Sequence, residues 1–346
     1  MNNKFDIFDI LVGKPEDPDY GNKPVIIQGI TGNFGSVHTR LMREYGTNIV
    51  AGVTPNKGGQ SFEGIPVFDS VKDASKTFNA KISGIFVPAQ FFLSAVKDAV
   101  NNGIKLLVAI PEHVPVRDAM ESLEYAQTNG AKIIGPNTPG VIVPSVNKIG
   151  IMPSQPFKKG NTAVFSRSGT LMYEVSFYLS KAGIGQKIAL GIGGDPINGT
   201  NLIEAFKLIS DRDDIESVVV VGEIGGDAEE SLVQHIEKTG FTKPVVAYVA
   251  GRSAPKEKRM GHAGAIVYGN YGSAESKISS FSRVNIPVAK RPAEVPGILE
   301  FILYRRNENS RVTLTEFIHV KAAIGMSEHF DRSCQGIDTT GIGFKC

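Results

Sequence analysis

Short, largely apolar runs recur along this chain, and each is followed by a turn and a stretch compatible with a helix. A strand whose successive residues are all apolar must be covered on both faces, which is typical of a parallel sheet between layers of helices. One set of runs lies at 25–27, 49–52, 82–87, 106–110 and 133–134, and a second set lies at 162–165, 188–192, 218–221, 244–249 and 286–288. The alternation therefore predicts two doubly wound α/β domains.

The predicted boundary between the two sets is the segment 136–156, which is rich in Pro, Gly and Asn and suits a linker. We expect a Rossmann-like domain at 23–145 and a flavodoxin-like doubly wound domain at 146–304. Residues 1–22 and 305–346 are then terminal extensions, and the sequence does not indicate their roles.

The charge balance excludes several classes of partner. There are 37 basic and 35 acidic side chains, for a net charge of +2, so we expect neither nucleic acid nor a membrane as a partner. Cys334 and Cys346, the two cysteines, suit neither a disulfide framework nor a zinc site, and we expect no metal held by the chain itself. With no long apolar run and no signal-like or transit-like start, the sequence predicts a cytoplasmic protein.

The first turn after a predicted strand reads QGITGNFGS over residues 28–36. Glycines at such a turn let backbone N–H groups and a helix N-terminus approach a phosphate. Dinucleotide sites place an acidic residue at the end of the second strand, whereas this chain has Lys57 there and no acid. A lysine suits a ligand with an additional phosphate, which favours coenzyme A and leaves NADP open. The alternative is that Lys57 is an ordinary surface lysine.

Three further turns follow predicted strands. At Ser168, Gly169 and Thr170, small polar residues at a strand-to-helix turn predict backbone donors for a phosphoryl group, although a simple helix cap is the alternative. The turns GPNTPG at 135–140 and GGDPINGT at 193–200 form either walls of a ligand site or merely tight turns.

His262 lies in the run GHAGA, and Glu223 lies upstream in GEIGG. A carboxylate can hold the proton on one imidazole nitrogen, which leaves the other nitrogen as a nucleophile toward a phosphoryl group. The alternative is that His262 is incidental to a turn and that Glu223 is a structural carboxylate. The sequence has no GxxxxGK[ST] motif, so phosphorylation of His262 would need another subunit to activate the nucleotide.

The motifs QGITGNFGS, GVTPNKGG, GPNTPGV, SRSGTLMYE, IGGDPINGTN, GEIGGDAEE and APKEKRMGHAGAI occur in this order between about residues 23 and 303. Together they closely resemble the α subunits of the succinyl-CoA synthetase family, within the nucleoside-diphosphate-forming acyl-CoA synthetases. The resemblance implies a reversible ligase of the tricarboxylic acid cycle type, which converts a carboxylate, CoA and ATP or GTP to acyl-CoA, nucleoside diphosphate and phosphate. It implies CoA on the first domain and an ATP-grasp β subunit that binds the nucleotide with Mg²⁺, in a heterodimer or heterotetramer.

The same resemblance implies roles for individual residues. His262 is the phosphorylated residue, Glu223 is its carboxylate partner, and Tyr173 falls on a position that contacts the acid substrate. The positions implied to contact CoA are Thr31, Gly32, Asn33, Phe34, Lys57, Ile110, Pro111 and Glu112.

Departures from the family leave the acid substrate open. Met172 stands next to Tyr173, where the family has threonine, and Pro111 also stands in place of a threonine. Met172 either lines the acid site, which would favour an acid such as malate or citrate, or packs in the core. A second alternative is a CoA- or dinucleotide-binding regulatory protein that has lost ligase activity, but the presence of both His262 and Glu223 argues against it.

Overall fold

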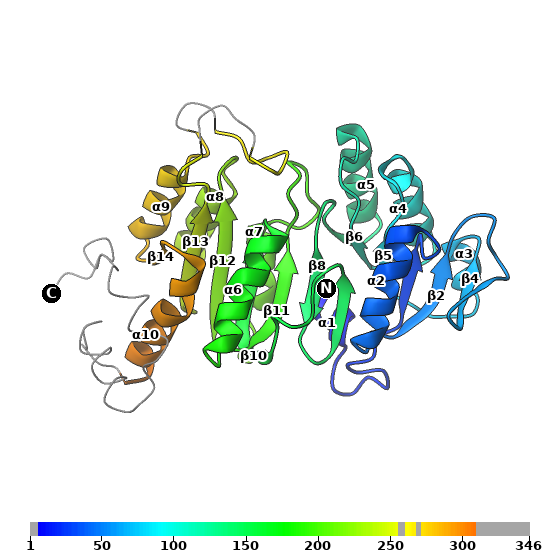
Figure 1. The fold of residues 1–346 in the computed structure, drawn as a ribbon, viewed down its shortest axis with the longest axis horizontal. Helices are drawn as coiled ribbons and strands as arrows, with labels where there is room; N and C mark the ends of the chain where they lie inside the picture. Colours follow the sequence, from blue (N-terminus) through cyan, green and yellow to red (C-terminus); the bar gives the residue numbers. More distant parts are fainter. Residues whose placement is uncertain (1–5, 255–259, 268–270, 309–346) are drawn as a thin grey trace. The chain divides into compact units, whose positions relative to one another are not determined.

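The computed structural model describes residues 6–254, 260–267 and 271–308, and it has an α/β fold (Figure 1). The chain forms two compact units, one of Met1–Ser154 with Ile188–Leu208 and one of Gln155–Lys187 with Ile209–Cys346. In the described ranges, no helix has the length and apolar character needed to cross a bilayer. The predicted domain boundaries stay predictions.

The first unit contains a sheet in the order β3-β4-β2-β1-β5-β6-β7. Its strands are β1 (Val25–Gln28), β2 (Ile49–Val53), β3 (Ser61–Phe62), β4 (Ile65–Phe68), β5 (Ile82–Ile85), β6 (Leu106–Ala109) and β7 (Lys132–Ile134). The strands pair in parallel except that β3 is antiparallel to β4. The direction of winding reverses between β1 and β5, which is where an open parallel sheet binds its ligand.

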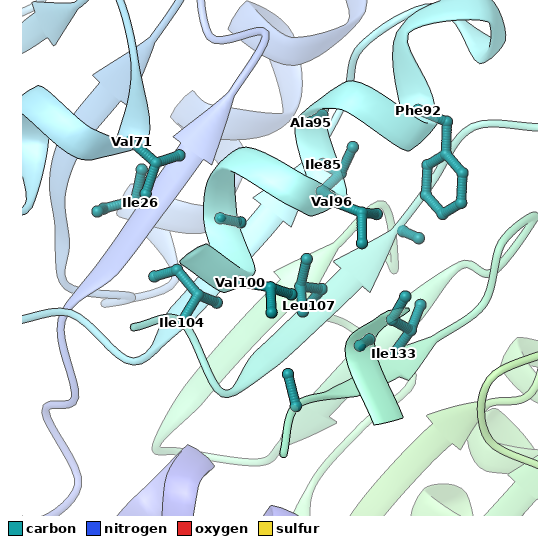
Figure 2. Close-up of a cluster of buried hydrophobic side chains, with 14 of the residues drawn as sticks. Ile26, Val71, Ile85, Phe92, Ala95, Val96, Val100, Ile104, Leu107 and Ile133 are labelled. Atoms are coloured by element: carbon teal, nitrogen blue, oxygen red, sulfur yellow. The ribbon is translucent and has the colours of Figure 1, made fainter. Parts of the chain in front are cut away.

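The main core of the first unit lies between this sheet and its helices. The helices are α2 (Asn33–Glu44), α3 (Val71–Ala74), η1 (Ala89–Phe91), α4 (Phe92–Asn101), α5 (Val116–Thr128) and α7 (Leu202–Ile209). Figure 2 shows Phe92, Val96 and Val100 of α4 beside Ile85 and Leu107 of the sheet. Their spacing of four residues aligns them on one helix face, and burial of each such side chain contributes roughly 1.5–3 kcal/mol.

The segment predicted to be an N-terminal extension packs into the first unit. Helix α1 (Ile7–Val12) begins where the Asp6 carboxylate accepts a hydrogen bond from the Phe8 amide, and it buries Leu11 completely. The Asn147 side chain donates a hydrogen bond to the Leu11 carbonyl at 2.6 Å. Residues 7–12 therefore contribute to the core of this unit.

The segment predicted to be a linker also has regular structure. It contains β8 (Gly140–Val143) and β9 (Asn147–Gly150), which form an antiparallel hairpin, and β11 (Gln186–Gly191) pairs antiparallel with β8. Of the residues that suggested a linker, Gly140, Asn147 and Gly150 lie at the ends of these strands and Pro144 lies in the turn between them. Composition averaged over the segment therefore concealed the hairpin.

The second unit contains the parallel strands β10 (Lys159–Ser166), β12 (Ser217–Glu223), β13 (Val245–Ala250) and β14 (Val288–Ala289), in the order β14-β13-β12-β10. All seven residues of β12 are buried, as a strand covered on both faces requires. Its helices are α6 (Gly169–Lys181), α8 (Ala228–Thr239), α9 (Ala274–Arg283), η2 (Pro292–Glu294) and α10 (Val295–Glu308). Helix α6 packs against α10, and α8 packs against α9, on opposite faces of these strands (Figure 1).

Candidate functional site

His262 and Glu223 lie in direct contact in the second unit. Nδ1 of the imidazole is 2.9 Å from each oxygen of the Glu223 carboxylate. Glu223 ends β12 and is 7% exposed, whereas the His262 side chain is 29% exposed. The structure therefore brings together the two residues predicted to be catalytic and leaves part of the imidazole open to a reactant.

Close backbone contacts explain the small residues around both side chains. Gly225 has a φ of +91°, and a side chain there would collide with the carbonyl group of Gly264. The Gly225 amide donates a hydrogen bond to the Gly272 carbonyl at 2.7 Å. The turn that carries His262 is closed by a hydrogen bond from the Met260 amide to the Ala265 carbonyl, and Ala265 is buried. Glycine at position 225 is thus what lets the two loops touch.

Arg167 also contacts Glu223. Since Ser166 of β10 pairs with Val221 of β12, Arg167 follows its strand next to the end of β12. Its Nη2 lies 3.6 Å from Glu223 Oε1, and its Nη1 donates hydrogen bonds to the carbonyl groups of Glu223 and Gly225 at 3.2 and 2.8 Å. The SRSG motif marked this turn in the sequence but indicated no role for its arginine.

The contacts continue into a buried ion-pair network. Glu229 is 0% exposed, and its Oε1 accepts a hydrogen bond from the Glu223 amide at 3.1 Å and lies 3.5 Å from Arg167 Nη1. Lys277, also 0% exposed, pairs with the other oxygen of Glu229 and with Glu230. Glu229 and Lys277 were missed because no local pattern marks a charged helix residue that points inward. We call Arg167, Glu223, Glu229, Glu230 and Lys277 the buried network.

The turn before α6 lies beside Arg167. Ser168 is the N-cap: its hydroxyl accepts a hydrogen bond from the Leu171 amide at 3.5 Å, and its own amide donates to Ser166 Oγ at 3.0 Å. The amides of Gly169 and Thr170 are in the first turn, where a helix offers no backbone acceptor. Ser168 thus has a structural role, while Gly169 and Thr170 can donate to an anion.

Tyr173 and Met172 occupy different environments on α6. The Tyr173 ring packs edge-on against Phe157, with centroids 6.2 Å apart, and burial raises the pKa of its phenol to about 12. The phenol therefore stays protonated near neutral pH and can donate to a carboxylate. Met172 is 0% exposed and packs in the core with Val175 and Leu179, which favours packing over the alternative that it lines the acid site.

The predicted CoA turn lies at the end of β1 in the first unit. Gly29 has a φ of +82°, and its amide donates to the Val53 carbonyl at 2.8 Å. Gly32 is the N-cap of α2, and it has no side chain to accept a hydrogen bond from the helix. The first-turn amides, including those of Asn33 and Phe34, therefore face the turn without a side-chain acceptor from the N-cap. The Thr31 hydroxyl donates to Thr54 Oγ at 3.1 Å and so ties this turn to the next one.

Lys57 lies on that next turn, and its side chain is exposed. Ile110, Pro111 and Glu112 follow β6 at the same edge of the sheet, because β1, β5 and β6 are adjacent parallel strands. Glu112 is exposed, but Ile110 is only 7% exposed and its amide donates to the Ile85 carbonyl, so Ile110 can present only its backbone carbonyl to a ligand.

An aromatic cluster that the sequence analysis did not identify adjoins the CoA turn. Phe34 is 52% exposed, and its ring centroid lies 4.5 Å from that of His38, which stacks on Phe86. Nδ1 of His38 is buried without a hydrogen-bond partner among the described residues, and burial lowers the pKa of His38. The four-residue spacing of Phe34 and His38 on a helix was the available signal.

Comparison with known families gives two matches in the order of the two units. The family described as CoA binding domain matches residues 21–113, and the family described as CoA-ligase matches residues 165–283. The α subunit of succinate–CoA ligase [ADP-forming] from Staphylococcus aureus (strain COL) is 47% identical over 278 residues, which cover 80% of this chain and 92% of that protein. The chain belongs to the succinate–CoA ligase α-subunit family.

A second succinate–CoA ligase relative supports this placement, and two solved structures share the fold. An α subunit named for the same ADP-forming ligase in Archaeoglobus fulgidus is 49% identical, covering 81% of this chain and 96% of that protein. ATP citrate lyase from Methanothrix soehngenii has a TM-score of 0.73 at 22% identity, with 82% of this chain and 50% of the lyase covered. The dinucleotide-forming acetyl-coenzyme A synthetase 1 of Ca. Korarchaeum cryptofilum has a TM-score of 0.64 at 20% identity, with 78% and 58% covered.

The chain spans about half the length of the lyase, and at these identities the likeness concerns the fold alone. The fold prediction is confirmed: a CoA-binding domain is followed by a CoA-ligase domain, both of the α/β class.

Proposed function

We propose that this chain is the α subunit of a succinate–CoA ligase that transfers a phosphoryl group through His262. The single observation that carries the proposal is the contact of 2.9 Å between His262 Nδ1 and both Glu223 oxygens, in a chain of this family. Succinate is the acid we propose, because Met172 packs in the core and gives no reason to expect malate or citrate.

The first step is attack of His262 on a nucleoside triphosphate. With its proton on Nδ1 and held by Glu223, the imidazole presents the Nε2 lone pair to the γ-phosphorus, and the nucleoside diphosphate leaves. The ring gains positive charge as the N–P bond forms. Glu223 stabilises that charge across 2.9 Å in a largely buried setting.

The second and third steps make the thioester. A carboxylate oxygen of succinate attacks phosphorus, which breaks the N–P bond, returns neutral His262 and forms an acyl phosphate. The thiolate of CoA then attacks the carbonyl carbon, and inorganic phosphate leaves. Two in-line transfers thus replace the direct reaction of an unreactive carboxylate.

Residues at the start of α6 can donate hydrogen bonds to the phosphoryl group and to the acid substrate. The amides of Gly169 and Thr170 can donate to phosphoryl oxygens at the positive end of the helix dipole. Burial raises the pKa of the Tyr173 phenol, so its protonated hydroxyl can donate a hydrogen bond to a carboxylate of the acid. Ser168 supports this arrangement as the cap of the helix.

The first unit suits CoA. The proposed phosphate contacts are the α2 amides around Gly32, Asn33 and Phe34, together with the exposed ammonium group of Lys57. A Cβ at Gly29 would approach the Phe86 carbonyl carbon to 2.9 Å, so the turn needs glycine there to pack against the backbone that follows β5. Thr31 supports the two turns, and the loop at 110–112 would contact CoA through its backbone and through Glu112.

The remaining parts of the reaction belong to a partner. We propose an ATP-grasp β subunit that binds ATP or GTP with Mg²⁺, in a heterodimer or heterotetramer, because this chain has no GxxxxGK[ST] motif. The subunit designation of the relatives supports a β partner. The cytoplasm is the proposed location.

Labelling of the complex tests the proposal. Coexpressed complex incubated with γ-³²P nucleotide is expected to carry acid-labile, base-stable label, and His262→Ala is expected to remove it. Glu223→Gln should slow labelling on the order of 10²–10⁴-fold, because a positioned acid–base partner is lost. His113→Ala, an exposed histidine of the first unit, is the matched control. Label that persists in the His262→Ala complex would exclude a phosphohistidine at this position.

A further inference from the structure

The buried network extends beyond the two residues that the proposed reaction uses. We infer that Glu229 and Lys277 are positioning residues which, through Arg167 and the backbone of residues 223–226, determine that Nε2 rather than Nδ1 of His262 accepts the phosphoryl group. The inference rests on the proposed function of His262.

Glu229 contacts both the backbone of Glu223 and Arg167, which lies beside the Glu223 carboxylate. One of its oxygens accepts the hydrogen bond from the Glu223 amide at 3.1 Å and lies 3.5 Å from Arg167 Nη1. Arg167 in turn lies 3.6 Å from the Glu223 carboxylate that contacts His262. Through these two contacts, Glu229 sets the direction in which Glu223 presents its carboxylate.

Lys277 makes a charged Glu229 possible at this depth. A carboxylate with no solvent exposure is costly unless it is paired and hydrogen-bonded, and Lys277, equally buried, supplies the charge. The Lys277 ammonium group also donates to the Gly226 carbonyl at 3.0 Å. The lysine thus connects α9 to the glycine turn that follows Glu223.

These contacts converge on one short segment. Arg167 contacts the carbonyl groups of residues 223 and 225, Glu229 contacts the amide of residue 223, and Lys277 contacts the carbonyl of residue 226. Loosening the network should let the Glu223 carboxylate shift away from Nδ1. The imidazole would then populate both tautomers, and the Nδ1 lone pair would compete for phosphorus.

Chemical phosphorylation tests this without the partner subunit. The purified full-length chain is treated with potassium phosphoramidate, whose P–N bond breaks to release ammonia as an imidazole nitrogen bonds phosphorus. ³¹P NMR distinguishes Nδ1- from Nε2-phosphohistidine, and the His262→Ala spectrum identifies the signals of the other five histidines. Wild type is expected to show only the Nε2 product at His262.

Two variants loosen the network in different ways. Glu229→Gln keeps the side-chain shape, and the double variant Glu229→Gln with Lys277→Met also removes the opposite charge so that no cation stays buried alone. Both are expected to give a mixture of products and labelling slowed roughly tenfold to a hundredfold. Glu294→Gln, which alters another buried carboxylate of the second unit outside the network, is the matched control and should keep the Nε2 product.

Thermal unfolding of the full-length chain verifies that each variant is folded. A folded Glu229→Gln or double variant that gives only the Nε2 product at the wild-type rate would overturn the inference. A wild-type chain with no label at His262, together with an unlabelled complex, would instead overturn the proposed function and this inference with it. A pure Nε2 product in wild type with mixed products in the variants supports both.

Discussion

At the scale of single residues, the proposed reaction requires the neutral tautomer of His262 that has its proton on Nδ1 and its lone pair on Nε2. The contact from both Glu223 oxygens favours this tautomer, and Arg167 Nη2 lies 3.6 Å from the same carboxylate. The arginine therefore helps to hold the carboxylate that orients His262.

Tyr173 provides a prediction about the acid substrate. Tyr173→Phe should raise the KM for succinate by on the order of tenfold to a hundredfold, because a hydrogen bond to a charged group contributes about 1.5–3 kcal/mol. Steady-state kinetics of the complex, with the concentration of succinate and then of CoA varied, would measure the KM for each. Tyr178→Phe, on the same helix, should leave both constants unchanged, and an equal rise in the KM for CoA would contradict a specific contact with the acid.

His38 predicts a pH dependence of stability. Burial lowers its pKa below the ordinary value of 6.5, so the unfolded chain binds more protons than the folded chain just below that pH. Its contribution to the unfolding free energy is therefore complete above about pH 6.5 and is lost as the pH falls toward the folded pKa. His38→Phe, which keeps an aromatic ring between Phe34 and Phe86, should lose less stability than wild type between about pH 7.5 and about pH 5.5, roughly the range in which a histidine titrates.

Chemical denaturation at several pH values measures this difference. His113→Gln is the control, because the His113 side chain is 85% exposed. Parallel stability curves for wild type and His38→Phe would show that His38 does not titrate differently in the folded chain.

At the scale of elements, the apolar runs predicted most strands, because a strand buried on both faces is a continuous apolar run that the local sequence alone reveals. The hairpin of β8 and β9 was missed because each strand has only four residues and Gly140, Asn147 and Gly150 lie within the strands. Glu229 and Lys277 are 48 residues apart, and only the packing of α8 on α9 brings them together. His262 and Glu223 were found because their glycine-rich settings resemble those of a known family.

The contact between the His262 turn and the end of β12 gives a prediction about an element. Gly225→Ala should reduce the unfolding free energy by about 1–3 kcal/mol and displace His262, because the new Cβ meets the Gly264 carbonyl group. Labelling of His262 should fall at least roughly tenfold, since about 1.4 kcal/mol of lost transition-state stabilisation has that effect.

Gly240→Ala is the matched control for this change. Gly240 ends α8 with a φ of +64° and has open space around its Cα, so the substitution costs about 1–2 kcal/mol of backbone strain without touching the site. Its labelling rate should equal that of wild type. If both variants lost labelling in proportion to stability, the close contact at Gly225 would have no specific role in placing His262.

At the scale of the whole molecule, the two candidate sites lie in different units. The candidate CoA turn belongs entirely to the first unit, and the histidine with its buried network belongs entirely to the second. Each unit builds its site at the carboxyl ends of parallel strands, where helix N-termini collect. Binding of CoA and phosphorylation of His262 should therefore be separable by mutation, with Lys57 affecting the first and Glu229 the second.

The same division leads to a prediction for the isolated chain. Purified alone, it should bind CoA and accept a phosphoryl group from phosphoramidate, yet neither hydrolyse ATP or GTP nor form succinyl-CoA. The reason is that its sequence has no phosphate-binding GxxxxGK[ST] loop, and no group of His, Cys, Asp or Glu side chains in its described ranges is placed to hold the metal ion that accompanies the nucleotide. Calorimetry would measure the binding of CoA, and a coupled assay for nucleoside diphosphate would measure hydrolysis of the nucleotide. Coexpression with an ATP-grasp subunit should restore turnover, whereas full ligase activity from a demonstrably pure chain would show that no second subunit is required.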